Sequence, residues 1–225
     1  MKTILVVAAH VDDEALGCGG TIARHAVNGD EVHVIFMADG VASRDQQNCN
    51  ELQLRNEAAE RAAAILGIKA IYHQNLPDNC MDSLPLLDIV QPLEKLINEI
   101  RPDTIYTHHI GDLNVDHRIT HQAVMTVCRP QPDYFVSEIY VFEVMSSTEW
   151  QSPGAPPFTP NVFVDIGRYL DVKKAALSEY AQEMRKAPHS RSMDNLENLA
   201  RYRGHSVGLT AAEAFMLIRK IDVNK

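Results

Sequence analysis

Continuous apolar runs alternate with segments of helical spacing along this chain. Residues 3–10 (TILVVAAH) form an apolar run, which is typical of a strand buried on both faces. Residues 12–29 have helical spacing and a closing glycine, which predicts a helix, and residues 31–40 predict a second strand. The same patterns then predict, in order, helix 50–67, strand 68–75, helix 86–100, strand 103–109, helix 116–129, strands 138–144 and 161–166, and helices 167–186 and 192–202.

Strands that alternate with helices need crossover connections, so the sheet should be mostly parallel with helices on both faces. This is a single-domain, Rossmann-like α/β architecture. No linker divides the chain, and 225 residues suffice for one domain with a sizeable core. We therefore expect one domain over residues 1–225. Pro92 lies inside the helix predicted over 86–100, which predicts a kink or a late start there.

Composition then narrows the functional class. Hydrophobic residues make up 45% and charged residues 23% of the chain, the balance of an ordinary globular protein. The formal net charge of −9 argues against a nucleic-acid partner. No apolar run is long enough for a signal peptide or a membrane span. The four cysteines lie far apart without a C-x-x-C pair, which argues against a disulfide framework and fits a cytoplasmic protein.

The end of the first strand carries an unusual group of polar side chains: His10, Asp12, Asp13 and Glu14. Acidic residues are common in the first turn of a helix, but helix capping leaves His10 unexplained. A dinucleotide site is disfavoured, because the G-x-G-x-x-G pattern fails at Ile22 and the carboxylates would repel a pyrophosphate. The third interpretation is a metal site at the carboxyl end of the sheet, where ligands bind in such folds.

In the metal interpretation, His10 and Asp13 converge on one ion, and Asp12 lies beside it. Hydrolytic zinc sites commonly have three protein ligands, so one more should come from another strand end. The stretch after the fourth strand, THHIGDLNVDHR (107–118), offers candidates in His108, His109, Asp112, Asn114, Asp116 and His117. A solvated loop with Asp116 as a helix cap is the plainer alternative. Two such clusters at one sheet edge favour a shared site.

These two clusters resemble motifs of the PIG-L/LmbE-like family of zinc-dependent N-acetylglucosamine deacetylases. Residues 9–14 (AHVDDE) match the motif A-H-P-D-D-E with valine in place of proline, and residues 114–117 (NVDH) match H-x-D-H with asparagine in place of histidine. Residues 54–67 are similar to the family's Arg-bearing helix. Residues 201–215 (RYRGHSVGLTAAEAF) are similar to its C-terminal R-G-x-x-x-G and A-E-A-F pattern, without the tyrosine that often precedes the latter.

The resemblance implies a Rossmann-like fold and one Zn²⁺ per chain, held by His10, Asp13 and His117. It also implies that Asp12 is the general base and that Arg55 contacts the substrate. A His₂Asp donor set discriminates metals weakly, so Fe²⁺ and Co²⁺ are alternatives.

Several residues beside the expected ligands keep two interpretations. Asn114 replaces the family's histidine near the oxyanion, so the oxyanion donor is either Asn114 or His109. Asp116 either orients a neighbouring histidine or caps the helix, and Glu14 is a helix-start or supporting carboxylate. Arg44, on the loop after the second strand, is either a substrate-binding residue or an exposed loop arginine.

The expected activity is removal of an acetyl group from an N-acetylated amino sugar, with release of acetate and a free amine. The amino sugar would be part of a GlcNAc-type glycoconjugate or a nucleotide sugar. A metal-dependent hydrolase of another amide or ester is one alternative. A catalytically inactive sugar-binding module is another, although the intact metal-binding motif argues against it. The expected partner is thus a small-molecule amino sugar, and a homo-oligomer stays open.

Overall fold

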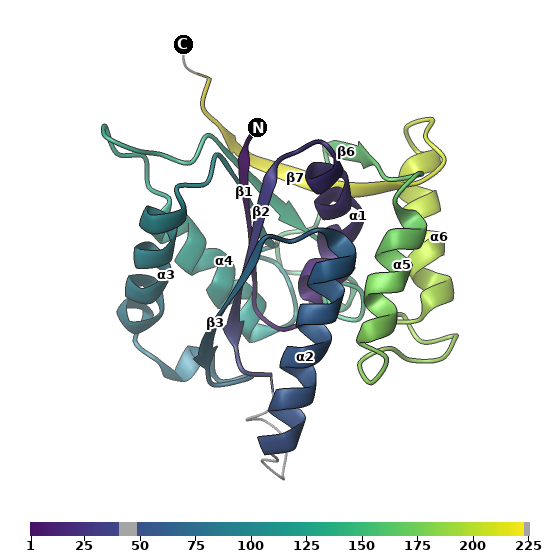
Figure 1. Cartoon of the computed structure of the whole chain (residues 1–225), viewed down its shortest axis with the longest axis horizontal. Helices are drawn as coiled ribbons and strands as arrows, with labels where there is room; N and C mark the ends of the chain where they lie inside the picture. The colour runs from purple at the N-terminus through teal and green to yellow at the C-terminus, as the bar shows by residue number, and fades with distance from the viewer. Residues whose placement is uncertain (41–48, 223–225) are drawn as a thin grey trace.

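The strands form one sheet in the order β3-β2-β1-β4-β5-β7-β6 (Figure 1). The computed structural model describes residues 1–40 and 49–222. The strands are β1 (Thr3–Ala8), β2 (Glu31–Ala38), β3 (Ala70–Leu76), β4 (Thr104–His108), β5 (Glu138–Phe142), β6 (Val162–Asp165) and β7 (Ala212–Lys220). The first five are parallel, and β7 runs antiparallel to both β5 and β6. The predicted mostly parallel α/β sheet is confirmed.

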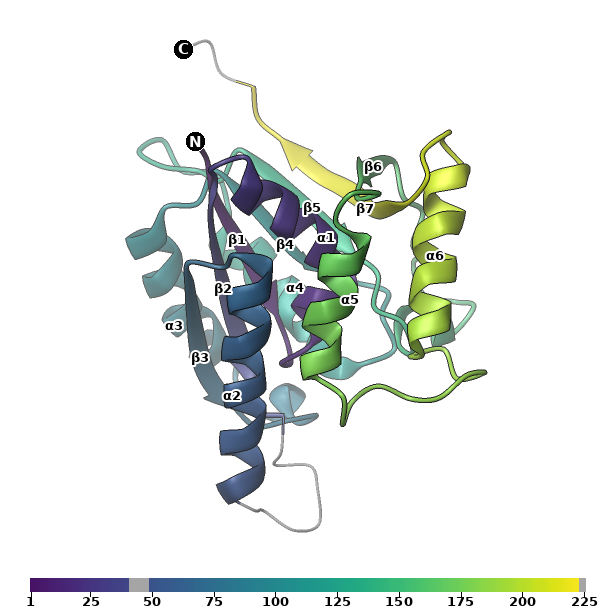
Figure 2. The same cartoon turned by 45° about the vertical axis from the view of Figure 1, so that its right-hand side comes forward.

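Helices cover both faces of this sheet. They are α1 (Asp13–Val27), α2 (Cys49–Leu66), α3 (Leu86–Ile100), α4 (Val115–Val127), α5 (Leu170–Glu179) and α6 (Met193–His205). Helices α3 and α4 lie on one face, and α1, α2, α5 and α6 lie on the other (Figures 1 and 2). None of the helices within residues 1–40 and 49–222 is both long and apolar enough to cross a membrane.

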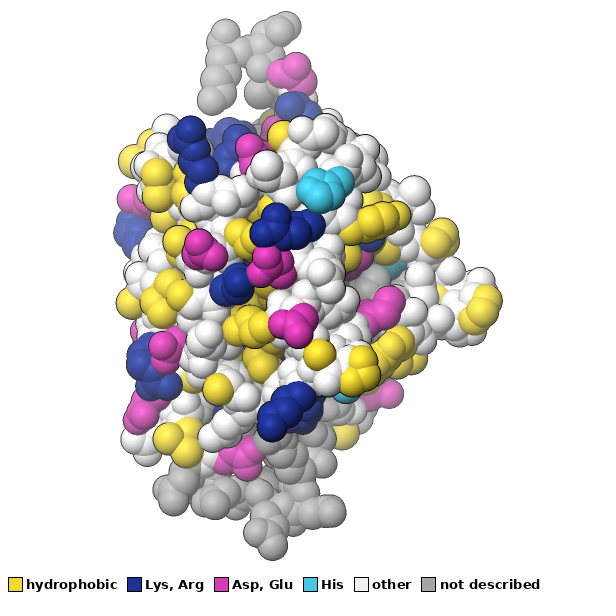
Figure 3. All heavy atoms as spheres, turned by 90° about the vertical axis from the view of Figure 1, so that its right-hand side faces the viewer, with side chains coloured by type: hydrophobic (Ala, Val, Ile, Leu, Met, Phe, Trp, Pro, Cys, Tyr) yellow, Lys and Arg dark blue, Asp and Glu magenta, His cyan; other side chains and the backbone are white. Residues whose placement is uncertain are grey.

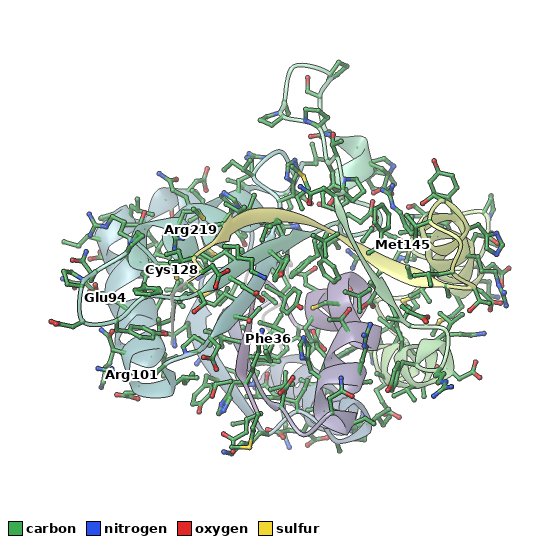
Figure 4. The ribbon with its side chains drawn as sticks, turned by 90° about the horizontal axis from the view of Figure 1, so that it is seen from above. Phe36, Glu94, Arg101, Cys128, Met145 and Arg219 are labelled. Carbon is green, nitrogen blue, oxygen red and sulfur yellow. The ribbon has the colours of Figure 1, made fainter. Side chains whose placement is uncertain are left out.

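Strand β1 belongs to two separate cores, one on each face of the sheet. Ile4 and Val6 join the core beneath α1, α2, α5 and α6, whereas Leu5 and Val7 join the core beneath α3 and α4. This double burial explains the continuous apolar run in the sequence. Viewed from above, Glu94 and Cys128 mark the α3–α4 side and Met145 marks the side of α5 and α6 (Figure 4).

The sheet order places the site-bearing segments side by side. Strand β1 lies between β2 and β4, so the chain reverses its winding direction there and opens a crevice at the carboxyl ends. Val7 of β1 pairs with Thr107 of β4. Just beyond that pair, the main-chain N–H of Ala9 donates to Nε2 of His108 at 2.8 Å. The two polar clusters of the sequence therefore meet in space.

Two features of the C-terminal third differ from the sequence prediction. The helix predicted over 167–186 ends at Glu179. The residues that follow do not continue the helix but cross the carboxyl edge of the sheet. No strand is predicted after residue 202, whereas β7 pairs there with β5 and β6. The last residues of β7 are half-buried or exposed, so this strand lacks the continuous apolar run of the central strands. Pro92 lies inside α3, which begins at Leu86 without a late start.

The outer face formed by α5 and α6 carries charges of both signs close together (Figure 3). Glu197 pairs there with Lys174 at 2.8 Å and with Arg201 at 2.7 Å. A surface that binds nucleic acid would show one sign in excess. This face therefore agrees with the acidic composition in offering no basic patch.

The glycines of α1 allow the helix to lie directly on the sheet. A Cβ atom on Gly17 would overlap the ring of Phe142, and one on Gly20 would lie 2.8 Å from Cβ of Ile166. The backbone leaves helical geometry between them, at Cys18 (φ −146°, ψ 22°). Close packing thus explains the glycine cluster that superficially resembles a nucleotide-binding loop.

Replacing Gly17 by alanine should destabilise the fold, because the new methyl group must displace the buried ring of Phe142. We expect a loss of about 1–3 kcal/mol in the free energy of unfolding, measured by denaturant titration. Gly154→Ala is the matched control, since nothing lies within 4 Å of a Cβ at that position. Equal stability of the two variants would contradict this account of the packing.

Candidate metal centre and active site

Three potential metal ligands converge at the carboxyl ends of β1 and β4. Oδ2 of Asp13 lies 3.4 Å from Nδ1 of His10 and 3.3 Å from Nε2 of His117. The ligand atoms of the three residues all lie within 4.8 Å of one another. The structure therefore brings His117 to His10 and Asp13, from which it is separated by more than a hundred residues in the sequence.

The outer nitrogen of each imidazole faces a buried carboxylate. Nε2 of His10 lies 3.1 Å from Oδ2 of Asp116 and 3.2 Å from Oδ1 of Asp78, and Nδ1 of His117 lies 3.1 Å from Oδ1 of Asp112. Metal-binding histidines usually have such a partner, which fixes the ring and makes the inner nitrogen a better ligand. Two oriented imidazoles and one carboxylate are a donor set that fits a divalent metal ion.

Asp116 acts as a support for His10 and not as a helix cap. Its carboxylate accepts hydrogen bonds from the main-chain N–H groups of Asn79 at 2.6 Å and Met81 at 3.1 Å. The N-cap of α4 is Asn114, whose Oδ1 accepts from the N–H of Asp116 at 2.8 Å. The helix-cap hypothesis for Asp116 is therefore wrong. His10, Asp78 and Asp116 form a second group with metal-ligand spacing, but Asp116 is already engaged in these hydrogen bonds.

The turn between β1 and α1 bends sharply to place its side chains. Asp12 has a φ of 106°, in the left-handed region that residues with a Cβ rarely adopt. Such strain persists only where surrounding contacts hold it, and it is typical of functional sites. Oδ2 of Asp13 accepts the N–H of His10 at 2.9 Å, and the carbonyl of Asp12 accepts the N–H of Leu16 at 2.9 Å. These bonds direct both carboxylates toward the site.

The pKa values of the adjacent carboxyl groups of Asp12 and Asp13 shift in opposite directions. Burial raises the pKa of Asp12 to about 6, although the Arg191 guanidinium 3.0 Å away opposes the shift and Asp13 adds to it. Burial acts in the same direction on Asp13, but the imidazoles of His117 and His108 outweigh it and hold its pKa well below the usual range. Asp13 thus stays ionised, which suits a metal ligand, while Asp12 can exchange a proton near neutral pH.

A polar cavity of about 220 Å³ opens beside these carboxylates. Its lining includes residues of both predicted ligand clusters and seven residues that the sequence does not indicate as site residues. The lining residues are His10, Asp12, Asp13, Gly40, Arg55, Asp78, Asn79, Asn114, His117, Ser146, Ser147, Glu183 and Arg191. The cavity thus draws on the carboxyl ends of β1 to β5 and on the segment between α5 and α6.

The two candidates for the oxyanion donor lie in different surroundings. Asn114 lines the cavity, and its Nδ2 donates to Oδ1 of Asn79 at 3.0 Å. His109 lies outside the lining, with Nε2 2.8 Å from the carbonyl of Pro156 and its ring centroid 5.5 Å from that of Phe158. The structure therefore brings Asn114, and not His109, to the metal ligands.

Of the two candidates for substrate binding, Arg55 and Arg44, the structure describes only Arg55. Arg55 lines the cavity, donates to the carbonyl of Gly40 and lies 3.4 Å from Oε1 of Glu183. Arg44 lies outside the described residues. Glu14 is buried, and its carboxylate accepts the N–H of Asp12 at 3.1 Å, which fits a supporting role.

Sequence reasoning misses several lining residues for different reasons. Asp78 and Asn79 directly follow β3, so the strand-end rule that found residues 107–118 could also have found them. Ser146 and Ser147 follow β5 in the same way. Arg191 gives no such signal, because it lies in an irregular segment far from any strand end and reaches Asp12 only through tertiary packing.

A Rossmann-like sheet with a His–Asp–His donor set at its carboxyl edge defines a metal-dependent α/β enzyme. The sequence signature of the PIG-L family, described as GlcNAc-PI de-N-acetylase, matches residues 5–128. This chain belongs to the PIG-L family.

Individual relatives extend this match over most of the chain. The uncharacterized deacetylase YaiS of Escherichia coli (strain K12) is 34% identical over 185 residues, 80% of this chain and 90% of that protein. The 4-oxalmesaconate hydratase of Pseudomonas putida is 26% identical over 194 residues, 78% of this chain and 72% of that protein. The structure of N,N'-diacetylchitobiose deacetylase from Pyrococcus horikoshii has a TM-score of 0.78 at 22% identity and covers 96% of this chain and 84% of that chain.

Freshly purified protein should contain about one divalent ion per chain. Binding of this ion should be lost in each of three variants, His10→Ala, Asp13→Ala and His117→Ala, because each removes one of the three proposed ligands. Elemental analysis of the purified variants measures this. His205→Ala is the control, since His205 is exposed at the end of α6. Full metal content in all three ligand variants would place the ion elsewhere.

Proposed function

We propose that this protein is a zinc-dependent hydrolase that removes the acetyl group from an N-acetylated amino sugar and releases acetate and a free amine. The observation that carries this proposal is the pair of Asp12 and Asp13 at one end of the cavity. The carboxylate of Asp13 faces the imidazoles of His10 and His117. The neighbouring Asp12 is a buried proton acceptor with a pKa of about 6. Membership of a family described by de-N-acetylation supports the choice of substrate.

Different site residues contribute to different steps of amide hydrolysis. Zn²⁺ held by His10, Asp13 and His117 would polarise the amide carbonyl and increase the acidity of a water molecule; Fe²⁺ and Co²⁺ suit the same donors. Asp12 accepts the proton of the attacking water and then returns it to the departing amine. Arg191 holds the carboxylate of Asp12 in place through its 3.0 Å contact.

The remaining assignments follow from position in the cavity. Asn114 is the donor to the tetrahedral oxyanion, since its amide retains a second N–H beside the one donated to Asn79. Asp116 orients His10. Arg55 forms a wall of the cavity where the sugar would bind.

The charge balance of the cavity favours an uncharged sugar over a phosphorylated one. Among residues 1–40 and 49–222, the lining has two arginines, and both already pair with carboxylates, Arg55 with Glu183 and Arg191 with Asp12. The many carboxylate, amide and hydroxyl groups of the lining suit the hydroxyl groups of a sugar. A GlcNAc-type glycoconjugate therefore fits better than a nucleotide sugar. Cys18, Cys80 and Cys128 are free thiols, which is consistent with our proposal of a cytoplasmic enzyme.

The function is tested by measuring acetate release from a panel of N-acetylated monosaccharides, oligosaccharides and nucleotide sugars, with protein of known metal content. We expect zinc-dependent release from uncharged N-acetylglucosaminides. Because one relative is a hydratase, the same protein is also assayed for water addition to unsaturated dicarboxylates. Hydration without acetate release from any member of the panel would overturn the proposal.

Asp12→Asn should retain the metal and the fold, because Asp12 is not one of the three ligands, yet lose about 10²- to 10⁴-fold in kcat through loss of the proton acceptor. Acetate release at saturating substrate and metal analysis measure the two effects. Loss of metal as complete as in Asp13→Ala would reverse the roles of the two aspartates.

Asn114→Asp keeps the oxygen that caps α4 but replaces the amide donor with an acceptor. If Asn114 serves the oxyanion, kcat should fall by about 10²- to 10³-fold, while metal content and melting temperature change little. His109→Ala is measured in parallel. A larger fall in kcat for His109→Ala than for Asn114→Asp would assign the oxyanion donor to His109.

A further inference from the structure

A buried ion pair occupies the break in α1. In a regular helix the N–H of Gly20 would donate to the carbonyl of Leu16, but the non-helical backbone of Cys18 separates these groups. The N–H of Gly20 instead donates to Oε1 of Glu213 at 2.9 Å, and that of Thr21 donates to Oε2 at 2.7 Å. The carbonyl of Leu16 accepts from Nζ of Lys173 at 2.8 Å.

The charges of Lys173 and Glu213 pair with each other away from solvent. Nζ of Lys173 lies 2.5 Å from Oε1 of Glu213, and the two residues are 4% and 5% exposed. Removing such a pair from water is unfavourable, so a buried ion pair by itself is weak evidence of stabilisation. Its polar atoms are directed at the main-chain groups on both sides of the break, Glu213 capping the second half of α1 and Lys173 closing the first.

The first half of α1 is the segment that carries the reactive carboxylates. It is short, and Asp12 at its start has strained backbone geometry. The C-cap residue of α5 holds this segment at a second point. The hydroxyl of Tyr180 donates to Oε1 of Glu14 at 2.7 Å, and the other oxygen of Glu14 accepts the N–H of Asp12. Contacts from α5, from Tyr180 directly after it and from β7 thus support the first half of α1.

We propose that Lys173 and Glu213 are positioning residues, which fix the first turn of α1 and thereby hold Asp13 against His10 and His117. The inference rests on the proposed function only where turnover is measured. It assigns a role to the glutamate of the C-terminal AEAF segment (212–215), which the sequence singles out but the chemistry of the cavity does not use.

The test compares Lys173→Met and Glu213→Gln with wild-type protein by competition for zinc against a chelator. We expect a 10- to 100-fold loss of zinc affinity, the range seen when a group supporting a metal ligand is removed. The visible absorption bands of the Co²⁺-loaded protein should shift, since they report ligand geometry. In turnover, kcat should fall while KM stays near the wild-type value, because no cavity-lining residue changes.

The matched control is Glu143→Gln, which breaks a neighbouring ion pair between Glu143 and Arg203 of α6, with contacts of 2.8 and 2.7 Å. It should lower the melting temperature without changing zinc affinity or the Co²⁺ spectrum. Unchanged affinity and spectrum in both test variants would overturn the inference and leave the pair a structural feature only. These two readouts need no turnover, so an inactive wild-type protein would count against the proposed function alone.

A double variant, Lys173→Met/Glu213→Gln, guards against simple misfolding of the single ones. It leaves no unpaired buried charge, so its melting temperature should recover toward that of wild-type protein. Its zinc affinity should stay lowered, because the main-chain groups at the break still lack their charged partners. Recovery of zinc affinity together with stability would overturn the inference.

Discussion

The site depends on one carboxylate oxygen, Oδ2 of Asp13. It accepts the main-chain N–H of His10 and lies within 3.5 Å of imidazole nitrogens from His10, His108 and His117. The surrounding imidazoles keep this buried group ionised. Because one oxygen gathers donors from β1, β4 and α4, any shift of the turn that carries Asp13 would spread the metal ligands apart.

The rest of the fold can be understood as support for that turn. The reversal of winding direction between β1 and β4 sets the two ligand segments side by side. Glycines let α1 lie directly against Phe142, and Asp112 and Asp116 hold the imidazoles from behind. Asp12 lines the cavity, and burial raises its pKa to about 6. In the proposed function, metal ligation and proton transfer are thereby divided between neighbouring residues.

Several features were out of reach of sequence patterns. Helix α5 ends at Glu179 although its helical spacing continues, because the chain there turns across the carboxyl edge and brings Glu183 and Arg191 to the cavity. Strand β7 is half-exposed toward its end and lacks an apolar run. The sequence leaves both His109 and Asn114 as candidate oxyanion donors, but the cap of α4 holds Asn114 at the cavity, while His109 turns to Pro156.

The sequence by itself determined the order of elements as far as α6, the α/β class and the turn from His10 to Asp13, since these depend on periodicity and on groups within a few residues of each other. The metal-ligand set followed from motif resemblance. Only the tertiary structure decided which distant groups support the site: Asp112 behind His117, Arg191 against Asp12, and the Lys173–Glu213 pair in the break of α1. Such partners depend on strand order and helix packing, and no local pattern of side chains encodes them.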